Sequence, residues 1–253
     1  TPYSIWLATV VVSGISYLSY LLKRYVFHES GVLVSGIIGG LYSSTATISV
    51  LARKSRKASA QEANEYVAAM LLAVSMMFLR FMILILIFSR EIFMSIYPYL
   101  LIMSVVAAVV AWFIHSRQRR SKDLSADSEE EDSSNPLEFK VALIFATLFV
   151  IFTVLTHYTL VYAGTGGLNL LSFVSGLSDI TPFILNLLQN TGSVAVLIVV
   201  ACSMQAIISN ILVNMFYALF FAGKGSKLRP WILGGFGTVI GVNLVLLLLF
   251  YFI

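Results

Sequence analysis

The chain alternates long apolar stretches with short clusters of charged residues along its whole length. Most of these stretches reach the roughly 20 residues that a helix needs to cross the hydrocarbon core of a bilayer. Because a helix satisfies its own backbone polar groups in lipid, the pattern predicts an all-α fold, a polytopic integral membrane bundle. Eight apolar segments can be drawn, at about residues 3–27, 31–52, 66–88, 96–115, 139–163, 168–188, 193–222 and 230–253.

The composition agrees with a membrane protein. Of the 253 residues, 59% are hydrophobic and only 11% are charged, and the mean hydropathy is +0.93, whereas soluble domains are roughly half apolar and a quarter charged. The lipid bilayer is therefore the first expected partner. Residues 3–27 are interpreted as a first span rather than a signal peptide, since apolar segments continue through the chain. The start at Thr1 without a methionine suggests a fragment with further membrane segments upstream.

A polar linker interrupts the apolar pattern at 117–136, with a basic first half and an acidic, Ser-rich second half. Such a composition is typical of disorder. The linker divides the chain into a first membrane repeat, 1–116, and a second, 137–253.

The two halves share an order of features. Each has a long span, a Gly-rich segment with polar residues in its middle, another long span and a last span. Aligning Gly40 with Gly176 places "GLYSSTATISVLARKS" over "GLSDITPFILNLLQNT" at low identity. This order predicts an internal duplication of about four apolar segments per half, and membrane transport proteins built from such repeats hold their sites near the midplane.

The positive charges bear on the path of the two Gly-rich segments, 31–52 and 168–188. If both segments span, nine of the fifteen Lys and Arg residues at segment ends fall on one face and six on the other. If both instead re-enter and return, fourteen share one face and only Arg90 lies on the other, which is the bias expected of a cytoplasmic face. The re-entrant interpretation makes the halves inverted repeats and the linker cytoplasmic, in the plasma membrane of a bacterium or archaeon. The alternative is plain spanning helices whose small residues form a packing face.

Polar residues in these two segments form the candidate ion-binding or pore site. A turn inside the membrane is tolerated where protein buries it or where it lines a wet cavity, so its hydroxyls either bond to the freed backbone or face a passing solute. The alternative assigns them to hydrogen bonds within and between helices. The candidates are Ser43, Ser44, Thr45, Thr47, Ser175, Ser178, Asp179, Thr181, Asn186 and Asn210.

Two charged residues lie deep inside apolar segments. Asp179 is the one acidic residue of twelve in such a segment, and Arg80 is the one strongly basic residue there. An ionisable group in the membrane is costly and is a functional candidate by default. Either the two form a structural ion pair across the repeat interface, or Asp179 is a metal ligand at an ion site with Arg80 as its charge partner.

Several function classes find no support. The sequence contains no HExxH, GxSxG or P-loop motif, and the three histidines lie near segment ends, so we expect no enzyme and no bound cofactor beyond an ion. The basic residues lie where membrane orientation already explains them. A nucleic-acid partner is therefore not expected.

Four stretches carry a resemblance to a known family: "GIIGGLYSSTATISVLARKSR", "MFLRFMI" (77–83), "SNPLEFKVAL" (134–143) and "SGLSDITPF" (175–183). There the chain resembles the uncharacterised membrane domain that follows an MgtC/SapB-type domain in certain bacterial and archaeal proteins, from about Tyr3 to the C-terminus. One position departs from the family: members often have a lysine where this chain has Asn214. The resemblance implies an upstream MgtC/SapB-type domain missing from this chain, and magnesium or another divalent cation.

Together these observations favour a channel or transporter for a small inorganic ion, with a divalent cation such as magnesium as the first expectation. A homodimer is expected from the frequency of two-fold assemblies. Two alternatives stay open. Arg80 and helix N-termini aimed at the centre favour an anion pathway, and a regulatory or assembly module would bind a partner domain and transport nothing.

Overall fold

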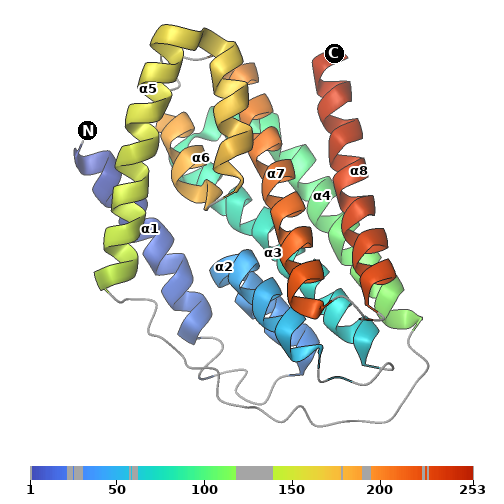
Figure 1. Ribbon diagram of the computed structural model, residues 1–253. Coiled ribbons are helices and arrows are strands. Elements are labelled where there is room, and N and C mark those ends of the chain that lie inside the picture. Colours follow the sequence, from blue (N-terminus) through green and yellow to red (C-terminus); the bar gives the residue numbers. More distant parts are fainter. Residues whose placement is uncertain are drawn as a thin grey trace.

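The computed structural model describes residues 2–21, 25, 31–56, 58, 62–117, 139–177, 179–189, 195–223, 226 and 228–252. Within these ranges the elements are α1 (Pro2–Leu21), α2 (Val32–Lys54), α3 (Ala63–Phe88), α4 (Arg90–Ser116), α5 (Phe139–Ser175), α6 (Ile180–Gln189), α7 (Val196–Ala222) and α8 (Arg229–Phe252). They form an elongated bundle (Figure 1). The prediction of an all-α bundle is confirmed. Apart from Arg117, the predicted linker lies outside the described residues.

Five of the described helices, α2, α3, α4, α7 and α8, have the length and apolar composition of membrane spans. The protein is therefore a membrane-spanning helical protein. In α3 and α7 more than half of the most apolar 18-residue stretch is buried against protein. These two helices are the ones on which the interior of the bundle is built.

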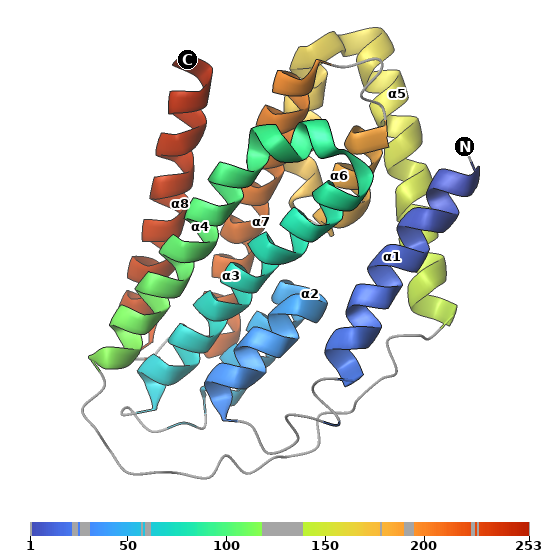
Figure 2. The same ribbon diagram turned by 180° about the vertical axis from the view of Figure 1, so that it is seen from behind.

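The helix α2 reverses direction in its middle. The backbone of Ser43 is extended (φ −158°, ψ 108°), and a Cβ on Gly39 would lie 2.5 Å from Oγ1 of Thr47. Eight residues along a straight helix would separate these positions by about 12 Å, so the arms 32–42 and 44–54 lie side by side (Figure 2). We call residues 32–54 the first hairpin. Each arm is about 16 Å long, roughly half the hydrocarbon core, so this segment has the geometry of a re-entrant one although its total length would suffice to span.

A second reversal lies within α5. Its long part turns at Gly164, whose backbone (φ 57°, ψ −148°) lies in a region that glycine adopts readily. Residues 166–175 then run back into the bundle, and α6 returns toward the same end (Figure 1). We call residues 166–189 the second hairpin. α5 ends at Ser175 and α6 begins at Ile180, directly after Asp179.

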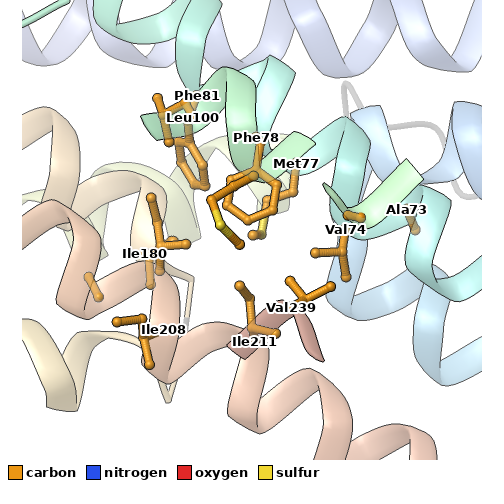
Figure 3. Packing of buried hydrophobic residues seen from close by; sticks show 14 of the residues in the cluster. Ala73, Val74, Met77, Phe78, Phe81, Leu100, Ile180, Ile208, Ile211 and Val239 are labelled. Carbon is orange, nitrogen blue, oxygen red and sulfur yellow. The ribbon is translucent and has the colours of Figure 1, made fainter. Parts of the chain in front are cut away.

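Both hairpins pack closely on the span that follows them. A Cβ on Gly40 would lie 2.5 Å from the Cα of Ala73 in the middle of α3. A Cβ on Gly176 would lie 2.3 Å from the Cβ of Ser209 in the middle of α7. Glycine is thus required where each hairpin tip meets its neighbouring span. Around these contacts, apolar side chains of α3, α4, α6, α7 and α8 point toward one another (Figure 3).

The ends of several helices meet at one end of the bundle. Just after α2, Arg56 donates to the carbonyl oxygens of Phe221 and Phe220 at the C-terminus of α7, and the guanidinium of Arg53 lies 4.3 Å from the centroid of the Phe221 ring. The C-terminal end of α4 and the N-terminal end of α8 lie at this end too, while the α3–α4 junction lies at the other (Figure 1). Basic residues at helix ends therefore gather on one side, with Arg90 opposite.

Candidate functional site

The tips of the two hairpins meet at the side chain of Arg80 on α3. This side chain is only 8% exposed. Its Nη1 donates to the carbonyl oxygen of Tyr42 at 2.8 Å, and its Nη2 donates to Oγ1 of Thr181 at 3.2 Å. Tyr42 ends the first arm of the first hairpin, and Thr181 lies in the first turn of α6. One guanidinium thus joins two segments that are far apart in sequence.

Each hairpin's second arm begins at a capped helix N-terminus beside this guanidinium. Oγ of Ser43 accepts from the backbone N–H of Ala46 at 3.3 Å. Oδ1 of Asp179 accepts from the backbone N–H of Thr181 at 2.9 Å. Serine and aspartate are among the preferred N-cap residues, because a side-chain oxygen satisfies an N–H that the helix leaves free. The partial positive charge of two helix N-termini therefore lies at the tips.

The structure gives Asp179 a cap position rather than a direct bond to Arg80. The two residues interact electrostatically, but the guanidinium donates to Tyr42 and Thr181. The side chain of Asp179 is exposed. In the part of the chain that the structure describes, no hydrogen-bonded ion pair joins the two.

One donor of Arg80 finds no acceptor among the described residues. A guanidinium has five N–H donors, and the two hydrogen bonds use two of them. The Nε atom is buried and, among the described residues, has no acceptor. Burying a charged group inside a membrane protein is unfavourable unless it is paired or hydrogen-bonded. Arg80 therefore carries a buried donor, Nε, without an acceptor among the described residues.

The remaining hydroxyl candidates of the first hairpin divide between the tip and the arms. Ser44 is buried at the start of the second arm, beside half-buried Thr45. The carbonyl of Thr45 accepts from the hydroxyl of Ser49 at 2.8 Å. Thr47 lies between the arms, against Gly39. Ser43, Ser44 and Thr45 thus belong to the tip, and Thr47 packs the two arms together.

In the second hairpin, α7 holds the tip in place. Nδ2 of Asn210 donates to the carbonyl oxygen of Gly176 at 3.3 Å, and Ser175 donates to the carbonyl of Ser172 at 2.7 Å. Asn186 donates to Oγ1 of Thr153 on α5 at 2.7 Å, and the hydrogen bonds of Arg80 do not include it. Ser178 lies outside the described residues.

One important group at the site, the carbonyl of Tyr42, could not be found from side-chain chemistry. It is a backbone group that becomes available because the helix breaks at Ser43. Its sequence signal is indirect: Tyr42 directly precedes the run of hydroxyl residues. The described residues contain no group of three or more His, Cys, Asp or Glu side chains suited to a metal ion. A metal bound through Asp179 stays a prediction.

The family assignment rests on a match that covers most of the chain. A family model described as "Domain of unknown function (DUF4010)" matches residues 10–222. The chain belongs to the DUF4010 family. Both hairpins and Arg80 lie within the matched part, so the site is part of the DUF4010 domain itself. Neither this match nor the relative below links the chain to MgtC/SapB-type domains, so that association stays a prediction.

A similar protein comes from Aquifex aeolicus (strain VF5), where it is described as "Uncharacterized protein". It is 25% identical over 199 residues, which cover 78% of this chain and 85% of the relative. No solved structure matches the chain.

Proposed function

We propose that this DUF4010 protein transports a small inorganic ion across a membrane and binds it where the two hairpin tips meet. The observation that supports this proposal is the junction of two half-membrane hairpins at one buried charged side chain, Arg80. Interrupted helices persist at membrane depth where protein buries them or where they line a water-filled cavity. Transporters place their substrate sites at such interruptions, near the bilayer midplane.

We propose as well that the two halves are inverted repeats. The order of long helix, hairpin and two long helices occurs twice, and corresponding elements run in opposite directions (Figure 1). Residues 136 positions apart play the same part in the two hairpins: Ser43 and Asp179 cap the second arms. Gly40 and Gly176 pack against residues that are themselves 136 positions apart, Ala73 and Ser209. An inverted duplication accounts for this correspondence.

The basic end of the bundle is the proposed cytoplasmic side. Arg53, Arg56, Arg117 and Arg229 belong to helix ends on that side, and cytoplasmic loops carry an excess of Lys and Arg. The linker joins α4 to α5 and would then be cytoplasmic. A bacterial or archaeal plasma membrane remains the proposed location, and magnesium, which the family resemblance implies, remains an untested candidate ion.

Flux measurements on the purified chain in sealed liposomes test the proposal. The ions are Mg²⁺, Mn²⁺, K⁺, Cl⁻ and sulfate, with empty liposomes as the blank. Thr181→Val deletes the hydroxyl that Arg80 contacts. Thr238→Val is the matched control, because its exposed hydroxyl donates to the carbonyl of Gly234 in its own helix.

We expect flux of at least one ion from the wild type and from Thr238→Val, with a reduced rate from Thr181→Val. A wild type that passes none of these ions would contradict the proposal. It would favour a module that binds a partner membrane protein.

A further inference from the structure

We infer that the solute bound at the hairpin tips is a small inorganic anion, such as a halide or an oxyanion, held by Arg80 and the two helix N-termini. The transport of this anion rests on the proposed function, but its binding does not.

The first observation is the buried guanidinium. More than nine-tenths of the Arg80 side chain is buried, and Nε has no acceptor among the described residues. The two acceptors that it does have, the carbonyl of Tyr42 and the hydroxyl of Thr181, are neutral. Arginine binds anions well because its planar donors are always charged and carry no acceptor. An anion at the tips would supply the counter-charge that these neutral acceptors lack.

The second observation is the pair of helix N-termini at the same place. The second arm of the first hairpin starts after Ser43, and α6 starts after Asp179. The first N–H groups of a helix have no partner within the helix, and each cap occupies one of them. The remaining N–H groups and the helix dipole favour an anion. The buried hydroxyls of Ser44 and Thr181 can donate to the same ion.

A divalent cation fits this arrangement poorly. Magnesium takes six oxygen ligands in a nearly ideal octahedron, and Asp179 is the one carboxylate that the described residues place at the tips. One of its oxygens already accepts from the backbone of Thr181. The freed carbonyl of Tyr42 is occupied by Arg80. Moreover, the positive charge of Arg80 would repel a cation placed between the tips.

Thermal stability of the purified full chain in detergent tests the sign of the ion. Sodium chloride, sulfate and phosphate are compared with sodium gluconate at constant ionic strength, and magnesium gluconate is the cation arm. A ligand that binds the folded state raises Tm in a concentration-dependent way. We expect at least one of the three anions to raise Tm and magnesium gluconate to leave it unchanged.

Two variants at the site sharpen the test. Asp179→Asn keeps the N-cap but removes a negative charge near the site, so the apparent Kd for the anion should fall by about threefold or more. Arg80→Gln should abolish the anion-dependent shift. Arg80→Lys keeps a positive charge and should weaken the shift in Tm. It replaces Arg80→Gln in the test if that variant does not fold. Arg90→Gln is the matched control and should behave as wild type, because Arg90 is an exposed arginine at the junction of α3 and α4.

The outcomes separate this inference from the proposed function. The anion assignment would be overturned if magnesium gluconate stabilised the wild type and Asp179→Asn abolished that effect. The absence of any anion-dependent shift in Tm would also overturn it. Anion binding that depends on Arg80 without flux in liposomes would support the site while contradicting transport. Flux of a cation without anion binding would support transport and contradict the anion site.

Discussion

Replacing Gly40 with alanine tests how closely the first hairpin is seated on α3. A Cβ at this position would lie 2.5 Å from the Cα of Ala73 and 2.7 Å from its carbonyl oxygen. Carbon atoms in contact are normally about 3.5–4.0 Å apart, so the arm must move away by about 1 Å. Both neighbouring atoms are backbone atoms, so no side chain can rotate aside. Overpacking of this kind costs about 1–3 kcal/mol, and replacing a helical glycine with alanine recovers about 0.5–1 kcal/mol. These two ranges leave a net loss of about 0–2.5 kcal/mol. Because the clash is with backbone atoms, we expect the free energy of unfolding to fall by about 1–2 kcal/mol.

Thermal melts in detergent measure this loss against Gly237→Ala. Gly237 lies on an exposed face of α8, and a Cβ there would have no atom within 4 Å, so this control receives the helix gain without the clash. For a chain of this size 1 kcal/mol shifts Tm by about 2–4 °C. Gly40→Ala should melt about 2–8 °C below the wild type and Gly237→Ala at or above it. Equal melting temperatures for the two variants would refute the close seating of the arm on α3.

Two further predictions concern the tip and the topology. Replacing Ser44 and Thr45 together with valine keeps the Ser43 cap, so Tm should change by less than about 4 °C. Ion flux should fall by about tenfold or more, which corresponds to a barrier higher by about 1.4 kcal/mol. A lower Tm with normal flux would show that these hydroxyls stabilise the hairpin instead. Cysteines that replace Arg56 and Arg90 should react with an impermeant maleimide from opposite sides of sealed vesicles, and labelling of both from one side would contradict the arrangement of helix ends.

The apolar pattern predicts the helices and favours both reversals, because the physics of the bilayer restricts what a break can look like. A chain that turns at membrane depth needs small residues for close packing and polar groups for the freed backbone, and the run from Gly36 to Thr47 supplies both. The charge count favours the same path, since with re-entrant segments only Arg90 is left on the far side. The structure brings the C-terminal ends of α2 and α7 together, as that count implies.

The detailed roles at the tips could not be predicted, because they depend on where the backbone leaves the helix. The extended residue is Ser43; this choice makes Ser43 a cap, frees the carbonyl of Tyr42 and turns Thr47 inward between the arms. A shift of the break by one residue would exchange these roles with little change in the apolar pattern. For the same reason neither alternative for Arg80 and Asp179, an ion pair or an ion site, predicted the neutral acceptors that the guanidinium meets.

The correspondence between Ser43 and Asp179 gives a test of what the one carboxylate at the tips contributes to stability. If Asp179 acts chiefly as a cap, Asp179→Ser installs the cap residue of the other hairpin, so the free energy of unfolding should stay within about 0.5 kcal/mol of wild type, while Asp179→Ala should lose about 1 kcal/mol. If Asp179 were instead the essential counter-charge of Arg80, both variants would leave a buried guanidinium uncompensated and lose about 3–5 kcal/mol. Denaturant unfolding in detergent distinguishes these cases, because they differ in the size of the stability loss and in whether Asp179→Ser is more stable than Asp179→Ala. Large and equal losses in the two variants would refute the cap role and establish the ion pair.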